Sequence, residues 1–309
     1  MGSPAPPPPP THAPPPPPQA DKGARRRERQ AAVTAAEELG VEGPRRAVPK
    51  TLENTREADP TTLPAGDPDA AAAAACDEFA PYFARDKAPA VLVTTSVSPK
   101  GATYRFAADL LEALPAAVFY RRGGHRLPKI VAYAAAKGFT HILVLNEGAA
   151  ATLDSLLVVH LPCGPTARFR LTNAVPCAAI RGHGRPTAHA PELVLRGFGT
   201  GVGSRVGRLL ASLFPVDPAF RGRQVATLHA QRDFVFFRHH RYVFEEKEGR
   251  GGGGAGGGRA RVAARLQELG PRFTLRLLSL HRGACAGRGA VAEWEPKKVA
   301  RGSRRRFVL

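Results

Sequence analysis

The stretch PAVLVTTSVSPKGATYRFAADLLEALP, Pro89 to Pro115, decides the fold. Its opening PAVLVTTS is a short apolar run, which is typical of a buried β-strand. The part from Ala102 onward repeats apolar residues at helical spacing and places Phe106, Leu110, Leu111 and Leu114 on one face. A strand followed at once by an amphipathic helix predicts a layered α/β domain that begins near Pro89.

The residues downstream continue this pattern. The expected elements are, in order, a strand in AVFYRR (117–122), a helix in LPKIVAYAAAKG (127–138), a buried strand in HILVLNE (141–147), and an antiparallel pair in SLLVVHLP (155–162) and TARFRLT (166–172). Pro128 suits the first turn of the helix, and Gly138 suits its C-cap. The fold class is therefore α/β.

A second unit of the same order follows in ELVLRGFGTGVGSRVGRLLASLFP, residues 192–215. It again runs from strand through a Gly/Ser-rich loop to a helix and Pro. Three leucines recur at an offset of 99, Leu110, Leu111 and Leu114 corresponding to Leu209, Leu210 and Leu213. These features indicate two copies of one α/β unit. GPRFTLRLLSL (270–280) adds a long strand, with Phe273, Leu275 and Leu277 on one face.

The remaining segments have less regular patterns. Residues 1–20 are Pro-rich, which indicates a disordered tail or a ligand for a Pro-binding domain. Ala24–Leu39 predicts a marginal helix, and 41–75 an extended and then low-complexity segment. The aromatics of Asp77–Phe83 are expected to dock on the domain. The Gly-rich residues 249–259 are expected to be a flexible linker that expands a hairpin loop.

The positive charge is concentrated in the folded part of the chain. The 309 residues hold 45 Lys and Arg against 26 Asp and Glu, and residues 90–309 alone hold 34 against 13. Only six of these 34 are Lys, and the planar fork of Arg suits phosphate. A codon bias toward Arg explains the choice of Arg over Lys, but it does not explain the shortage of acids. A polyanionic partner such as RNA is therefore the leading inference.

The hairpin GRQVATLHAQRDFVFFRHHRYVF, 222–244, joins an apolar root to a basic tip. AQRD predicts its turn. By alternation Phe234 and Phe236 face one side and Val235 and Phe237 the other, so we expect this half to be buried on both faces. The basic residues beyond it predict an RNA-contacting rib, in which Tyr242 stacks on a base. A solvated strand end is the alternative.

Other patterns point to chemistry only weakly. Gly197–Arg208 matches neither GxGxxG nor Walker A, yet free backbone amides with Arg205 and Arg208 at the start of a helix suit a phosphate. A loop that is merely flexible is the alternative. His229, Asp233, His239 and His240 are close in sequence, but polar strand positions explain them better than a metal site. The four Cys show no zinc spacing, no catalytic motif is present, and no apolar run is long enough to span a membrane. We therefore expect no cofactor, no metal and no membrane partner.

Many of these stretches, in this order, resemble the Brix-domain family of ribosome assembly factors. The likeness rests on Pro89–Pro115, VFYRRG, HILVLNE, LVVHLPCGPTARFRLTN and the 222–244 hairpin, and covers about residues 47–309. It implies a Brix domain at 89–309, made of two similar halves that resemble anticodon-binding domains, at about 89–190 and 191–309. It also implies an extended segment at 47–88 that docks on the domain. Residues 1–46 are then a disordered Pro-rich and basic tail.

The resemblance also implies a function. Family members are nucleolar and non-enzymatic and bind pre-ribosomal RNA, and the likeness here is to a member that acts in large-subunit assembly. The expected partners are large-subunit pre-rRNA, large-subunit ribosomal proteins and other assembly factors, among them one small dedicated partner. The RNA-binding residues that we predict are Arg121, Arg122, Lys129, Arg205, Arg208, Arg221, Arg223, Arg232, Arg238, Arg241, Tyr242, Arg304, Arg305 and Arg306. The alternatives are the small-subunit branch, an RNA-modifying or nucleotide-dependent enzyme, and a module that binds acidic proteins.

Overall fold

The computed structural model describes residues 27, 30, 31, 34, 49–57, 59–64, 66–148, 152–247, 261–285, 290–296 and 307–309. The chain forms two units, Met1–Asn54 and Thr55–Leu309. In the first, the described residues of the predicted Ala24–Leu39 helix are helical, and Thr34 Oγ1 donates a hydrogen bond to the Gln30 carbonyl at 2.8 Å. The predicted Pro-rich tail, residues 1–20, lies outside the described residues.

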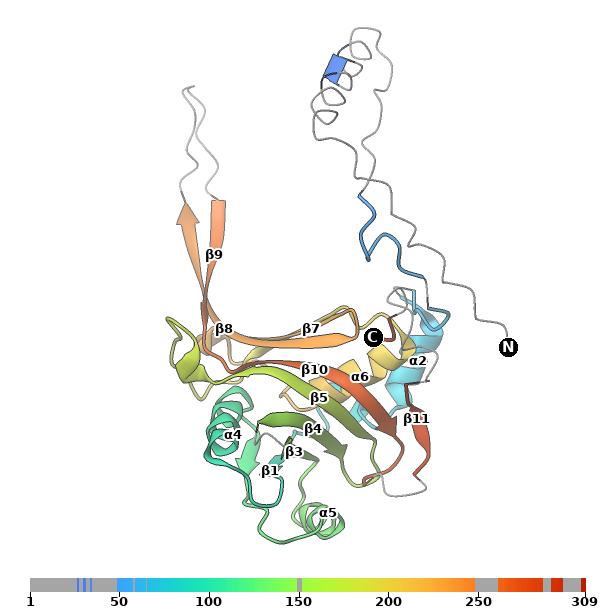
Figure 1. The fold of residues 1–309 in the computed structure, drawn as a ribbon, viewed down its shortest axis with the longest axis vertical. Helices are drawn as coiled ribbons and strands as arrows, with labels where there is room; N and C mark the ends of the chain where they lie inside the picture. Colours follow the sequence, from blue (N-terminus) through green and yellow to red (C-terminus); the bar gives the residue numbers. More distant parts are fainter. Residues whose placement is uncertain are drawn as a thin grey trace, which may run out of the picture. The chain divides into compact units, whose positions relative to one another are not determined.

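The second unit is built on one mixed sheet of 11 strands, in the order β2-β1-β3-β4-β5-β10-β8-β7-β6, with β11 paired to β10 and β9 paired to β8 (Figure 1). The strands are β1 (Val91–Thr95), β2 (Ala117–Phe119), β3 (His141–Glu147), β4 (Leu153–His160), β5 (Thr166–Val175), β6 (Glu192–Arg196), β7 (Gln224–Gln231), β8 (Phe234–Lys247), β9 (Arg261–Glu268), β10 (Arg272–His281) and β11 (Ala292–Trp294). The helices are α2 (Pro68–Cys76), α3 (Ala80–Phe83), α4 (Gly101–Ala113), α5 (Leu127–Ala136) and α6 (Gly201–Ala211), with 3-10 turns at Cys177–Ala179 and Phe220–Gly222. The predicted α/β class is confirmed.

Helices cover the two faces of this sheet unequally. The face that we call the inner face carries the main core, in which α4 and α6 pack on residues such as Phe169, Val235 and Leu275. On the opposite, outer face, α5 packs on β1, β3 and β4 through Leu92, Ile142 and their neighbours. Among the described residues, no helix packs on the outer face of β5, β10, β8, β7 and β6. That part of the sheet is therefore open.

The topology explains why the outer face is half covered. Each of β1–α4–β2 and β6–α6–β7 is a strand, a helix and a parallel strand, which is compatible with two similar halves. In the first, α5 then leads from β2 across the outer face to β3. In the second, β7 continues directly into β8 through a tight turn at Arg232 and Asp233, whose φ angles are 54° and 66°. The predicted turn between β7 and β8 therefore stands where α5 stands in the first unit, and in the described part of the chain no helix follows β7 on the outer face.

The segment before β1 docks on the inner-face core. As predicted, the aromatics of Asp77–Phe83 dock on the domain, with Phe79 fully buried, Tyr82 2% exposed and Phe83 partly buried against the same core. The prediction of an extended, low-complexity stretch up to residue 75 is wrong at its end, because Pro68–Cys76 form helix α2. Asp67 caps this helix by accepting the Asp69 N–H at 3.0 Å, and the alanine run has the highest intrinsic helix propensity.

The strands β8 and β9 continue together beyond the sheet as a two-stranded ribbon (Figure 1). Their antiparallel pairing runs from His240↔Glu268 to Lys247↔Arg261. Residues 248–260, which include the predicted Gly-rich insertion, thus connect the two strands of a hairpin, and they lie outside the described residues.

Candidate nucleic-acid interface

The uncovered outer face of the sheet carries arginines and aromatic rings together. We call it the open sheet face and define it by the outward residues of five neighbouring strands, Arg168 and Arg170 of β5, Arg272, Thr274 and Arg276 of β10, Phe234, Phe236 and Arg238 of β8, His229 of β7, and Arg196 of β6. Their partners in the alternation, such as Phe169, Leu275 and Val235, are buried on the inner face. Alternation along the strands, interrupted in β10 by register shifts near Arg272 and Leu277, therefore creates the surface.

Cross-strand pairing places the rings among the guanidinium groups. Phe236 is paired with His229 on one side and Thr274 on the other, and Arg196 follows beyond His229. In the next row, Arg276 is paired with both Phe234 and Arg170. The His229 and Phe236 ring planes are inclined by 29°, with centroids 6.4 Å apart, and the Arg276 guanidinium lies 5.6 Å from the Phe234 ring centroid.

These rings correct the prediction that the start of β8 is buried on both faces. Val235 and Phe237 are buried, but Phe234 and Phe236 are only half-buried because no helix covers them. Half-buried aromatics beside arginines provide π faces on which unpaired bases stack, together with cations for the phosphates between those bases.

The arginines of this face differ in how fully they are engaged within the chain. Arg272 forms two hydrogen bonds with Glu268, at 2.8 and 2.5 Å, and Arg238 donates to the Phe237 carbonyl at 2.7 Å. Partial burial lowers the pKa of Arg238, and the negative charge of nearby Glu268 opposes this lowering. Arg170 lies 4.0 Å from Asp154, whereas Arg168 and Arg196 are exposed and make no ion pair with any described residue. Arg168, Arg170 and Arg196 therefore have guanidinium N–H groups that are available to a ligand.

The predicted rib on the β7–β8 hairpin does not form one cluster. At one end of the hairpin, Arg221 and Arg223 directly precede β7, and Arg241 of β8 is paired with Gln224, the first residue of β7. Arg232 lies in the turn at the other end. Eight strand residues separate the two ends, roughly 26 Å at about 3.3 Å per residue. The four arginines therefore do not form a single contact site for a short RNA segment.

Two of the predicted contacts already have partners within the chain. Arg241 donates to the Arg185 carbonyl at 2.6 Å. Tyr242 donates its hydroxyl to Glu192, and this hydrogen bond raises the pKa of Tyr242. The Tyr242 ring also contacts Phe244, at 5.3 Å between centroids.

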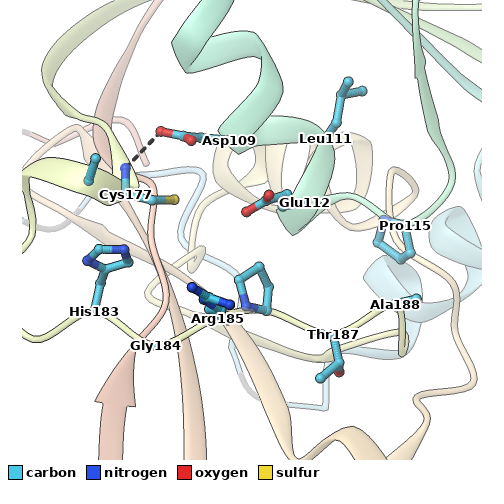
Figure 2. Close-up of a pocket in the computed structure, with 12 residues that line it drawn as sticks. Asp109, Leu111, Glu112, Pro115, Cys177, His183, Gly184, Arg185, Thr187 and Ala188 are labelled. Atoms are coloured by element: carbon cyan, nitrogen blue, oxygen red, sulfur yellow. Dashed lines mark hydrogen bonds between the residues drawn. The ribbon is translucent and has the colours of Figure 1, made fainter.

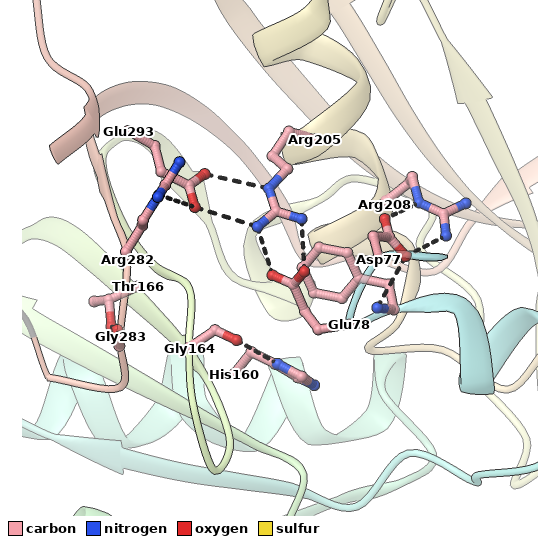
Figure 3. Close-up of polar contacts among 11 residues, drawn as sticks. Asp77, Glu78, His160, Gly164, Thr166, Arg205, Arg208, Arg282, Gly283 and Glu293 are labelled. Carbon is pink, nitrogen blue, oxygen red and sulfur yellow. Dashed lines mark hydrogen bonds and ion pairs between the residues drawn. The ribbon is translucent and has the colours of Figure 1, made fainter. Parts of the chain in front are cut away.

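Arg205 and Arg208 hold the N-terminal segment on α6 (Figure 3). Arg205 forms a two-pronged contact with Glu78 at 2.7 and 2.6 Å, and reaches Glu293 at 3.2 Å. Arg208 binds both carboxylate oxygens of Asp77, at 2.5 and 2.6 Å. An RNA phosphate would have to displace these carboxylates, so the geometry favours a structural role for both arginines.

The Gly-rich turn before α6 also differs from the prediction of free amides. Thr200 caps the helix and accepts the Gly203 N–H at 2.9 Å, and the Ser204 N–H bonds the Thr200 carbonyl at 2.7 Å. The Gly201 N–H donates to the Thr61 carbonyl at 2.9 Å. The prediction is wrong for these three amides, because the chain itself satisfies them.

The remaining predicted residues fall in two places. Arg121, Arg122 and Lys129 come together around a cavity of about 200 Å³ at the N-terminus of α5. Arg304, Arg305 and Arg306 lie outside the described residues. The residues that follow them dock on the domain, with Phe307 and Leu309 buried and the Val308 and Leu309 amides donating to Asp233 Oδ1 at 2.5 and 3.2 Å.

A larger cavity, of about 660 Å³, lies between α4 and residues 177–188. Figure 2 shows Asp109 and Glu112 facing it from α4, with the Asp109 carboxylate accepting the Cys177 N–H at 2.7 Å. Burial and the neighbouring Asp109 raise the pKa of Glu112, and burial raises the pKa of the Cys177 thiol to about 12. His183 and Arg185 line the same cavity, so its charge is mixed, and the two carboxylates make it less suited to a polyanion than the arginine-rich face of the sheet.

The described residues contain no group of three His, Cys, Asp or Glu side chains that could hold a metal ion. His239 is buried beside the Gly270 carbonyl, 3.1 Å from its Nδ1, and burial lowers its pKa to about 4. Within the same part of the chain, no helix combines the length and apolar character needed to cross a bilayer.

Sequence reasoning missed most of the open sheet face. Of its residues, only Arg238 was predicted to bind RNA. The signal was present, because Arg168 and Arg170 alternate with Ala167, Phe169 and Leu171 in a single strand. The pairing of β5 with β10 was needed to show that Arg170 and Arg276 lie side by side.

Comparison with known proteins adds the family. The model of the Brix domain matches residues 96–279. Ribosome production factor 1 of Xenopus laevis is 42% identical over 277 residues, which cover 88% of this chain and 76% of that protein. The protein of the same name from Mus musculus is 42% identical over 278 residues (88% and 74%), and that from Saccharomyces cerevisiae 39% over 275 residues (88% and 85%). The chain belongs to the Brix-domain family.

Proposed function

We propose that the protein is a non-enzymatic, rRNA-binding assembly factor of the large ribosomal subunit precursor that acts in the nucleolus. The relatives named ribosome production factor 1 support a role in making ribosomes. The open sheet face is the observation that carries RNA binding, since it combines exposed arginines with half-buried aromatic rings. Its ligand is unpaired RNA, because only unpaired bases reach a flat aromatic surface.

The proposed role is to hold RNA segments while neighbouring parts of the precursor are folded and processed. Phosphate contacts from Arg168, Arg170, Arg196 and Arg276 supply the affinity, and stacking on Phe234 and Phe236 orients the bases. The cavity between α4 and residues 177–188 carries charges of both signs, from Asp109, Glu112 and Arg185, and we assign it to protein contacts. The partners that we expect are large-subunit ribosomal proteins and other assembly factors, among them one small dedicated partner.

In-cell ultraviolet cross-linking of the tagged protein, followed by sequencing of the attached RNA, tests this function. Reads concentrated in large-subunit rRNA and its adjoining spacer would support it. Reads in the small-subunit precursor would move the protein to that branch of assembly. Recovery of no RNA above background would refute RNA binding and leave the charge to acidic protein partners.

A further inference from the structure

The cavity of about 200 Å³ opens at the carboxyl ends of β1 and β2, beside the first turn of α5. It is lined by Leu92, Thr94, Tyr120, Arg121, Arg122, His125, Lys129, Ile130 and Tyr133. Sites for drug-sized ligands are larger, at about 300–1,000 Å³, whereas one water occupies about 30 Å³. The cavity therefore suits one small group rather than a drug-sized ligand.

The topology makes this position a crevice between two strands. The helix that follows β1, α4, packs on the inner face, and the helix that follows β2, α5, packs on the outer face. Because β1 and β2 are parallel neighbours, the chain leaves their carboxyl ends in opposite directions. Ligands of open α/β sheets bind in this kind of crevice.

A buried polar atom inside the cavity lacks a partner. Thr94 is 1% exposed, and its Oγ1 makes no hydrogen bond with any described residue. The walls near it, Leu92 and Ile130, are apolar. Leaving a buried hydroxyl unpaired costs free energy, so a ligand that supplies a hydrogen-bonding edge gains affinity here.

The mouth of the cavity is aromatic and basic. Tyr120 and Tyr133 are 43% and 46% exposed, with ring centroids 6.5 Å apart. Arg121, His125 and Lys129 are exposed around them, and no carboxylate is among the described lining residues.

Two further features favour an anion at this mouth. Arg122 braces the loop by donating to the His125 carbonyl at 3.1 Å and the Thr95 carbonyl at 3.4 Å. The N-cap residue of α5, Arg126, makes no capping bond with its side chain, and the partial positive charge at the start of this ten-residue helix favours an anion there. This contribution comes from the helix dipole rather than from free amides, because Pro128 has no N–H and the Lys129 N–H bonds the Arg126 carbonyl at 3.1 Å.

We propose that this cavity binds a single nucleotide. The base enters against the Thr94 hydroxyl and contacts the two tyrosine rings, and its phosphate lies at Arg121, Lys129 and the start of α5. An unpaired nucleotide of RNA and a free nucleoside monophosphate share this chemistry. The assignment to RNA rests on the proposed function, and gives it a second contact, separate from the open sheet face.

Calorimetric titration of the full chain tests the pocket with a matched pair of variants. Thr94→Val removes the hydroxyl inside the cavity. Thr95→Val removes the adjacent hydroxyl, which is also buried and without a described partner but points to the inner face. With an unpaired RNA of about 12 nucleotides, we expect Thr94→Val to weaken binding by about 3- to 10-fold and Thr95→Val to leave it unchanged. Cross-linked peptides from the wild type should contain Tyr120 or Tyr133 when sequenced by mass spectrometry.

The possible results distinguish a failure of the nucleotide pocket from a failure of the proposed RNA-binding function. RNA binding that is equally strong in both variants, with cross-links only on the open sheet face, would overturn the pocket and leave the function standing. Nucleoside monophosphates that bind as tightly as the RNA, and lose affinity in Thr94→Val, would support the pocket with a free nucleotide as its ligand. Wild-type protein that binds neither RNA nor monophosphates would refute both.

Discussion

Removing the outermost arginines of the open sheet face should change the salt dependence of RNA binding. The variant carries Arg168→Gln, Arg170→Gln, Arg196→Gln and Arg276→Gln, four side chains that the structure leaves exposed. For single-stranded RNA each phosphate contact contributes a slope of about −0.7 to the plot of log affinity against log salt, so four contacts contribute about −2.8. Between about 50 and 200 mM salt, the wild type should then lose about 50-fold more affinity than the variant.

Fluorescence anisotropy with a labelled, unpaired oligonucleotide measures this difference over a salt series. The matched control removes four arginines outside the open sheet face, by Arg85→Gln, Arg105→Gln, Arg181→Gln and Arg265→Gln, and so keeps the same net charge as the variant. Its slope should stay near that of the wild type. Equal slopes for variant and control would refute the reasoning, because affinity would then follow net charge rather than the arrangement on the sheet.

Three further predictions concern stability. Arg205→Ala should lower the free energy of unfolding by about 2 kcal/mol, because Glu78 and Glu293 lose the guanidinium that both bind in a partly buried site. If the variant unfolds in urea like the wild type but binds RNA more weakly, Arg205 contacts RNA instead. His141 and His160 are buried and their pKa values are lowered, chiefly by burial, so the folded state favours the neutral form of both rings. Stability should be full above about pH 6.5 and fall below it, and identical urea midpoints at about pH 7.5 and 5.5 would contradict this. Asp233→Ala should lower stability by about 1–3 kcal/mol, through the loss of its bonds to the Val308 and Leu309 amides, and an unchanged melting temperature would show that these bonds are dispensable.

The sequence was most informative where a pattern depends on near neighbours. The alternation of strands and helices after Pro89, the turn at Arg232 and the docking of Phe79 all follow from periodicity or composition within about 15 residues. Helix α2 is not predicted, because an alanine run is equally typical of a low-complexity segment, although Asp67 and Pro68 form a normal helix start.

The roles of individual arginines depend on partners that are far away in the chain. Arg205 meets a carboxylate 127 residues earlier, and Arg208 one 131 residues earlier, so local sequence showed only two cations at the start of a helix. Phe234 and Phe236 have the composition of a buried strand, and only the absence of a helix over β8 leaves them half exposed. Charge alone therefore predicted a polyanion partner but not which arginines face it.

The central pairing of β5 with β10 has a practical consequence for work with fragments. The pairing runs from Val175 with Arg272 to Thr166 with His281, so segments on either side of residue 190 share one sheet although the chain between the two strands is long. Cutting the chain near residue 190 would expose the hydrogen-bonding groups of both strands, and unprotected strand edges of this kind recruit other chains. Each of the two fragments expressed alone should therefore aggregate, whereas the two fragments co-expressed as separate chains should reassemble through the pairing of β5 with β10.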